Sequence, residues 1–230
     1  MANFTSNLPI CRLQGGVKME KNMKKVEKLK DLGDLNKILN EYKDLVIQIF
    51  QIGYIREITK DYRYKRAEKF QSYNAFNTTT HVALENFYLL LLWKMFDETN
   101  SKLTVYDIKT ETKDRNFIKW FNEKIKEIKK ENKEDEDKEV DILRRWRNKV
   151  IGHRDISVHF NHKLIESEFP LNDEKVEKLK FFLLEFLCQL DYLCDNNKSI
   201  DSAREMYQTI LDEHKALCFK GAEMSLKDFL

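Results

Sequence analysis

Cationic side chains and one histidine are concentrated between Arg144 and Asp155. This segment holds an arginine or lysine at five positions, 144, 145, 147, 149 and 154, and no carboxylate before Asp155. Arg147 and His153 are separated by five residues, and Asn148 directly follows Arg147. An arginine binds phosphate oxygens through its planar fork of N–H groups, and a histidine exchanges a proton near neutral pH. Together with an amide, these residue types are a minimal set for cleaving a phosphodiester without a metal ion.

The position of Arg147 on its predicted helix is unusual for a charged residue. The pattern predicts a helix over residues 138–151 that ends at Gly152, a residue type favoured just past a helix end. At about 100° per residue, Arg147 falls inside the apolar stripe that contains Val140 and Leu143. Burying an unpaired guanidinium costs several kcal/mol, so Arg147 must be paired, lie at an interface or face a polar cleft.

Two structural interpretations of these residues compete with the catalytic one. The aliphatic stem of Arg147 can lie along the core while its charged head reaches solvent. His153 can cap the end of the helix, where a cationic imidazole meets the exposed carbonyl groups. The residues themselves leave both interpretations open.

Composition and periodicity predict the elements that position this segment. The 230 residues include only 2 prolines and 6 glycines, with 35% charged and 42% apolar residues, as is typical of amphipathic helices. We therefore expect an all-α fold, an antiparallel up-and-down bundle of about five to six helices. Helical patterns cover residues 20–65 (with a break at Gly33-Asp34), 67–96, 114–130, 138–151, a segment from residue 173, and 199–217, and residues 97–104 are predicted to form a turn with Ser101 as an N-cap.

These patterns divide the chain into one helical domain with appended segments. Residues 1–18 are polar and are predicted to be disordered, and residues 19–66 are predicted to form a helical extension that packs on the bundle. Residues 67–195 are predicted to form the bundle itself, and residues 196–230 a C-terminal helix and tail. The helix that begins near residue 173 is apolar on most faces, so we expect it at the buried centre.

The cysteines and apolar stretches indicate the compartment. The four cysteines include no Cys-x-x-Cys pair and no other metal-ligand spacing, and they fit a reducing cytoplasm. Residues 1–18 contain no apolar run typical of a signal peptide, and the apolar stretch Val82–Phe96 is too short to span a bilayer. We expect a soluble cytoplasmic protein with no membrane partner. The formal net charge is only +2, so any nucleic-acid surface must be a local patch.

The segment Arg147–His153 is similar to the motif of the HEPN superfamily, in which an arginine and the polar residue after it are followed by a histidine. The helix that ends with Leu89–Asp97, together with Ser101–Thr104 after it, resembles the AbiU-like branch of that superfamily, which is associated with abortive infection. The sequence His153-Arg154-Asp155 and the apolar helix that follows resemble the same branch. The resemblance covers residues 67–195.

This resemblance implies a metal-independent endoribonuclease of toxin–antitoxin or phage-defence type, with no metal or cofactor. It implies a homodimer that brings the two motifs together, with RNA as substrate and an antitoxin or other regulatory protein as a partner. His153 would help proton transfer while the ribose 2′-OH attacks the adjacent phosphate, Arg147 would stabilise the phosphate charge, and Asn148 would orient the site. The flanking cations expected to bind the RNA are Arg144, Arg145, Lys149 and Arg154.

A second function is also compatible with these residues. A non-catalytic helical interaction module that binds nucleic acid, a nucleotide or an acidic protein partner would show salt-sensitive binding without turnover. The histidines at 153, 159 and 162 fit no known metal-site spacing and are interpreted as loop residues. We interpret Trp93, Trp120 and Trp146 as packing residues, and the lysines between residues 124 and 133, which alternate with glutamates, as a solvated face.

Overall fold

The described part of the chain is helical wherever it has regular secondary structure. The computed structural model describes residues 32–66, 73–99, 103–148, 170–195 and 197–227. Within these residues it contains seven helices and no strand, so the predicted all-α helical bundle is confirmed. The number of helices is slightly larger than expected.

The helices agree well with the periodic patterns in the sequence. In chain order they are α1 (Leu32–Arg66), α2 (Tyr73–Phe96), α3 (Val105–Thr112), α4 (Arg115–Ile128), α5 (Glu139–Trp146), α8 (Asp173–Cys194) and α9 (Ile200–Lys227). Gly33 and Asp34, which are predicted to form a break, are helical within α1, so this prediction is wrong. The last helix, α9, continues to Lys227, well beyond its predicted end at residue 217.

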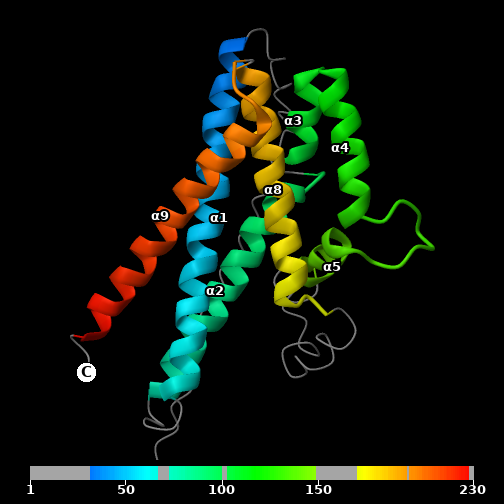
Figure 1. Ribbon diagram of the computed structural model, residues 1–230. Coiled ribbons are helices and arrows are strands. Elements are labelled where there is room, and N and C mark those ends of the chain that lie inside the picture. The colour runs from blue at the N-terminus through cyan, green and yellow to red at the C-terminus, as the bar shows by residue number, and fades with distance from the viewer. Residues whose placement is uncertain (1–31, 67–72, 100–102, 149–169, 196, 228–230) are drawn as a thin grey trace, which may run out of the picture.

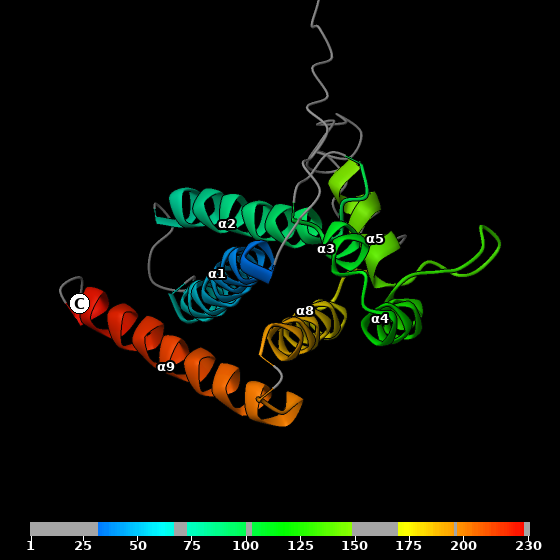
Figure 2. The same ribbon diagram turned by 90° about the horizontal axis from the view of Figure 1, so that it is seen from above.

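The helix α1 is one of the two described helices with the most extensive contacts to the others. It packs against α2, α8 and α9, and Figure 2 shows it between α2 and α9. The long helices alternate in direction along the chain: in Figure 1, α1 runs downward, α2 upward, α4 downward, α8 upward and α9 downward. This is the antiparallel up-and-down arrangement expected from the sequence.

A cluster of aromatic rings joins α8 to α1 and α4. The ring centroid of Phe186 on α8 lies 5.1 Å from that of Tyr42 on α1 and 5.2 Å from that of Phe117 on α4. Phe182, one turn earlier on α8, lies 6.1 Å from Phe121 on α4. All five side chains are buried, and aromatic pairs in such tilted or edge-on geometry add about 0.5–1.5 kcal/mol each beyond the burial of area. The apolar helix α8 is therefore buried as predicted.

The short helix α3 is not predicted from the sequence. Its N-cap is Thr104, whereas the predicted cap, Ser101, lies outside the described residues. The Thr104 hydroxyl accepts a hydrogen bond from Asp107 N at 3.1 Å and donates one to Asp107 Oδ2 at 2.9 Å. A helix of 8 residues shows too little periodicity to be recognised by its apolar pattern. The capping pattern Thr-x-x-Asp is the local signal that marks its start.

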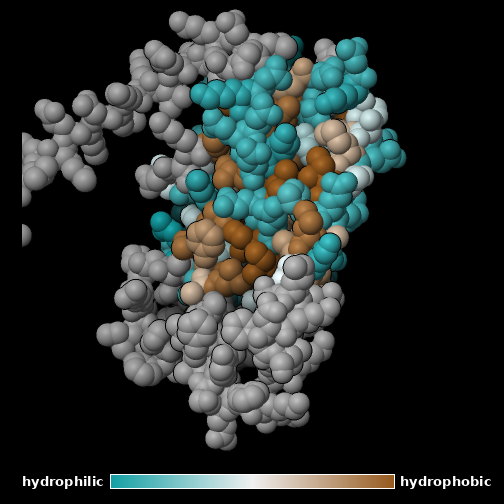
Figure 3. Space-filling model, turned by 90° about the vertical axis from the view of Figure 1, so that its left-hand side faces the viewer, coloured by the Kyte–Doolittle hydropathy of each residue, from teal (hydrophilic) through white to brown (hydrophobic). Residues whose placement is uncertain are grey.

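The surface of the bundle carries several exposed apolar side chains. Ile55 on α1, Phe87 and Leu90 on α2 and Leu217 on α9 are among them. Figure 3 shows the face of the molecule that lies to the left in Figure 1. On this face, apolar surface, in brown, is gathered in the lower half of the coloured region. No helix in the described residues combines the length and the apolar character that a bilayer crossing requires.

Leu183 and Phe181 are close neighbours on α8 with opposite environments, 0% and 60% exposed. The Leu183→Ala substitution removes buried methyl groups and leaves a cavity, so it should lower the free energy of unfolding by about 2–5 kcal/mol. Phe181→Ala, the matched control, should lower it by less than about 1 kcal/mol. Urea unfolding followed by circular dichroism measures both changes. Equal losses would contradict the placement of α8 in the core.

Candidate functional site

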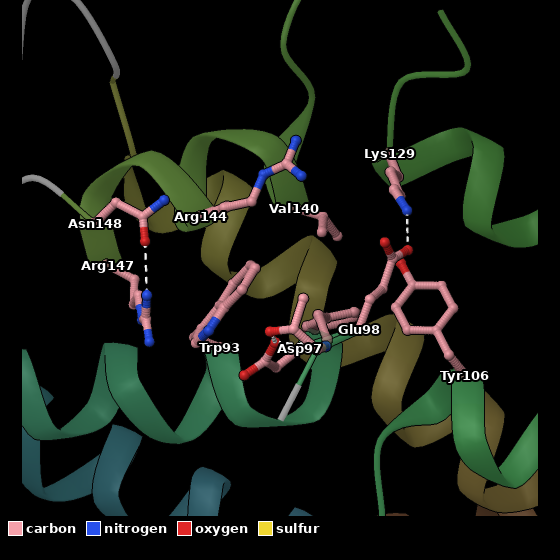
Figure 4. Close-up of a pocket in the computed structure, with 11 residues that line it drawn as sticks. Trp93, Asp97, Glu98, Tyr106, Lys129, Val140, Arg144, Arg147 and Asn148 are labelled. Atoms are coloured by element: carbon pink, nitrogen blue, oxygen red, sulfur yellow. Dashed lines mark hydrogen bonds and ion pairs between the residues drawn. The ribbon is translucent and has the colours of Figure 1, made fainter. Parts of the chain in front are cut away.

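A cavity of about 260 Å³ lies beside the C-terminal end of α5. Its walls come from the end of α2 and the residues after it, from α3, from the end of α4, and from α5 with the turn that follows (Figure 4). The lining residues are Trp93, Phe96, Asp97, Glu98, Thr99, Tyr106, Lys129, Val140, Arg144, Arg147 and Asn148. One cavity thus contains both described residues that are predicted to be catalytic, Arg147 and Asn148, together with Arg144.

Arg147 faces this cavity from the first residue after α5. The side chain is half-buried, and its Nη1 donates a hydrogen bond to Asn148 Oδ1 at 2.8 Å. Among the described residues, no carboxylate pairs with Arg147. Its charged head is therefore held by a neutral amide, and in Figure 4 it lies beside the ring of Trp93. The sequence predicts that Arg147 is paired, lies at an interface or faces a polar cleft. In the structure it faces a cleft with polar residues in its walls.

The helical geometry changes at Arg147. The Arg147 N–H donates to the carbonyl oxygens of both Leu143 and Arg144 as α5 ends at Trp146. Arg147 and Asn148 have π-helical geometry. Single π-helical turns are rare in proteins, and those that occur are often found at functional sites. The regular helix predicted for this segment therefore changes geometry at the two residues that carry the candidate chemistry.

Arg144 reaches the cavity from the exposed face of α5. Its Nη2 donates a hydrogen bond to Asp141 Oδ1 at 3.0 Å, and Asp141 Oδ2 accepts one from Lys130 N at 2.9 Å. Asp141 is only 1% exposed, so a buried carboxylate links α5 to the residues after α4. Arg144 can contact a phosphate only by sharing or leaving this carboxylate.

Arg145 lies on the exposed face of α5 but does not line the cavity. It forms an ion pair with Asp137, whose carboxylate also lies 2.8 Å from Lys130 Nζ. Burial opposes ionisation of this carboxylate, but the hydrogen bond from Lys130 and the charge of Arg145 hold the pKa of Asp137 below its usual range. Arg145 is therefore both paired and separate from the cavity that holds Arg147.

Lys129 closes the opposite end of the cavity, just after α4. It forms an ion pair with Glu98, and its Nζ lies 4.9 Å from the ring centroid of Tyr106. Its side chain is only 26% exposed, so the prediction of a solvated face for lysines 124–133 is wrong at this position. The physical reason is that a carboxylate and an aromatic ring from neighbouring elements both attract the ammonium group.

Trp93 and Tyr106 line the cavity, and each carries a buried polar atom that sequence reasoning does not point to. Trp93 Nε1 and Tyr106 Oη have no hydrogen-bond partner among the described residues. Burial, with a contribution from nearby carboxylates, raises the pKa of Tyr106, so its hydroxyl stays protonated and can donate. Trp93 also packs against the core, as predicted, but packing accounts for only part of its environment. No sequence spacing relates these residues to Arg147.

Three of the predicted site residues, His153, Lys149 and Arg154, lie outside the described residues, as does the rest of the histidine-containing segment. The described part of the chain has no group of three histidine, cysteine or acidic side chains placed to hold a metal ion. Because His153 lies outside the described residues, its role in proton transfer beside Arg147 stays a prediction.

Comparison with known families gives a match over well more than half of the chain. Residues 35–209 match the HEPN family described as AbiU2. The match includes most of α1, every helix that lines the cavity and the first part of α9. It is longer than the similarity of residues 67–195 that is visible from the motifs alone. No curated protein and no solved structure matches the chain.

Asp141 and Asp201 each pair with an arginine three residues later on the same helix, but their side chains are 2% and 84% exposed. Asp141→Asn should lower the free energy of unfolding by about 1–3 kcal/mol, because the amide oxygen cannot replace both acceptor oxygens of the carboxylate. Asp201→Asn, the matched control, should lower it by less than about 1 kcal/mol, as is typical of an exposed pair. Urea unfolding measures both, and similar losses would contradict the structural role given to Asp141.

Proposed function

Since this chain belongs to the AbiU2 family of HEPN proteins, we propose that it is a metal-independent endoribonuclease of toxin–antitoxin or phage-defence type. The proposed substrate is RNA, because the reaction uses the ribose 2′-OH that DNA lacks. The proposed catalytic residues are Arg147, Asn148 and His153.

The environment of Arg147 is the single observation that carries this proposal. Its guanidinium lines a cavity, and its hydrogen bond within the described residues goes to the amide of Asn148, so its positive charge is available to an anion. The fork of an arginine accommodates a phosphate through two parallel hydrogen bonds. Its neighbours Arg144 and Arg145 differ, since each is paired with a carboxylate.

The proposed reaction transfers the phosphate to the neighbouring 2′ oxygen. That oxygen forms a bond to phosphorus, the bond from phosphorus to the 5′ oxygen of the next nucleotide breaks, and the products carry a 2′,3′-cyclic phosphate and a 5′-OH. Arg147 stabilises the charge that builds on the non-bridging phosphate oxygens, and Asn148 orients the guanidinium. His153 acts in proton transfer, accepting the 2′ proton or donating one to the departing 5′ oxygen.

A homodimer would supply both of these proton-transfer groups at one site. Two-fold symmetry brings identical residues of the two protomers together, so one copy of His153 accepts the 2′ proton while the other protonates the leaving oxygen. The flanking cations Arg144, Arg145, Lys149 and Arg154 would hold the RNA backbone, and an antitoxin or other regulatory protein would restrain the activity. No step in this scheme requires a metal ion or a cofactor.

Purified protein should cleave RNA in the presence of EDTA, and the Arg147→Ala variant should cleave it about 10²- to 10³-fold more slowly, the loss typical of one group that stabilises developing charge. His153→Ala should be slower by about 10²- to 10⁴-fold, the contribution typical of positioned acid–base catalysis. Arg147→Lys should recover only part of the rate, because lysine keeps the charge but loses the planar fork. Gel analysis of a labelled single-stranded RNA measures these rates.

Two residues of α9 provide matched controls. Arg204 and His214 both bind other side chains and lie away from the cavity, so Arg204→Ala and His214→Ala should leave the cleavage rate unchanged. Cleavage that persists undiminished in both Arg147→Ala and His153→Ala would contradict the proposed function. RNA binding that weakens with salt and is never followed by cleavage would indicate the non-catalytic interaction module instead.

A further inference from the structure

Two residues that line the cavity each carry a donor atom without a partner in the described part of the chain. Trp93 Nε1 and Tyr106 Oη are buried, and neither has a hydrogen-bond partner among the described residues. Leaving such groups unpaired is costly, and folded proteins rarely do so without a reason. Both atoms belong to residues that line the same cavity as Arg147. A molecule that enters the cavity and accepts hydrogen bonds would satisfy them once the two rings turn these atoms toward it.

The cavity also has an aromatic wall beside a group that can bind phosphate. In Figure 4 the indole of Trp93 stands between the head of Arg147 and the carboxylate of Asp97, with Tyr106 at the far end. Nucleobases stack on aromatic side chains and are recognised through hydrogen bonds to their edges. The volume of about 260 Å³ lies just below the range of drug-sized sites, which begins at about 300 Å³, so it suits one base and not a longer stretch of RNA.

The charges around the cavity determine the direction in which a nucleotide can enter. Arg147 has no carboxylate partner among the described residues, whereas Lys129, at the opposite end, is paired with Glu98. Asp97 also lines the cavity, and in Figure 4 it lies between Trp93 and Glu98. A phosphate is therefore attracted to the Arg147 end, where no described carboxylate offsets the positive charge, and the uncharged base lies toward Tyr106.

We propose that this cavity binds the base of the nucleotide whose 2′-OH attacks, with the 3′-phosphate of that nucleotide on Arg147. Trp93 and Tyr106 are then the residues that determine which base precedes the cleaved bond. An indole N–H can only donate, so the preferred base presents an acceptor, a keto oxygen or a ring nitrogen, to Trp93. This inference rests on the proposed ribonuclease function, but the binding step can be measured without cleavage.

Isothermal titration calorimetry with the four nucleoside 3′-monophosphates measures that binding step. The wild-type protein should favour one base, and Trp93→Phe and Tyr106→Phe should each weaken binding of the favoured nucleotide by about 2- to 10-fold, the effect of one neutral hydrogen bond. Tyr106→Phe removes only a hydroxyl that has no partner in the described residues, so it should fold like the wild type. Arg147→Ala should weaken the binding of all four nucleotides by the same factor, because all four carry the phosphate.

Trp120→Phe and Tyr42→Phe are the matched controls. The ring of Trp120 stacks against that of Phe182, away from the cavity. The hydroxyl of Tyr42 is buried and lacks a partner in the described residues, like that of Tyr106, but Tyr42 does not line the cavity. Neither control variant should change nucleotide binding.

Cleavage of an RNA that presents all four bases before the cut provides the second readout. The wild-type protein should cut after the base that binds most tightly, and Trp93→Phe and Tyr106→Phe should reduce that preference by about 2- to 10-fold while cleavage continues. Selective nucleotide binding without any cleavage would contradict the ribonuclease function and support the base site. The base site would be overturned if the wild type bound none of the four nucleotides or bound all four equally. It would also be overturned if neither Trp93→Phe nor Tyr106→Phe changed binding. Both conclusions hold whether or not RNA is cleaved.

Discussion

The packing of α8 is the interaction on which the rest of the fold depends. Burial of apolar surface is favourable by about 25 cal/mol per Å², so a helix that is apolar on most faces must be surrounded. In Figure 2, α1 and α9 cover α8 on one side and α4 and α5 on the other, in agreement with their contacts. Because α5 is held against α8 and ends just before Arg147, the covering of α8 also positions the candidate site.

A second constraint acts on charge at the end of α5. Arg144, which reaches the cavity, and Arg145, which does not, are paired with the carboxylates of Asp141 and Asp137. Arg147, which faces the cavity, is held by the amide of Asn148 instead. A cation that is partly removed from water attracts an anion more strongly than an exposed one does, and a fold gains no stability from leaving it without a counter-charge. Departures of this kind from local stability rules are expected where a protein binds its ligand.

Sequence periodicity is sufficient to predict the long helices but not the residues that line the cavity. The helices α4 and α8 could be predicted because each repeats its apolar pattern over several turns, whereas the 8 residues of α3 do not. The polar environment of Arg147 could be anticipated, since a cation inside an apolar stripe has few stable alternatives. Trp93, Tyr106 and Lys129 could not be anticipated as its neighbours, because they reach the cavity from α2, α3 and the end of α4. No local spacing encodes a contact between separate elements.

The central claim is that Arg147 holds a phosphate while the adjacent 2′-OH of the RNA attacks it. Mass spectrometry of the products formed from a short RNA of defined sequence, cleaved in EDTA, tests this claim most directly. The account predicts a 2′,3′-cyclic phosphate and a 5′-OH at every cut, and no cut where a single 2′-deoxynucleotide replaces the ribonucleotide before the cleaved bond. Ends with a 3′-OH and a 5′-phosphate, or cleavage after the 2′-deoxynucleotide, would contradict it.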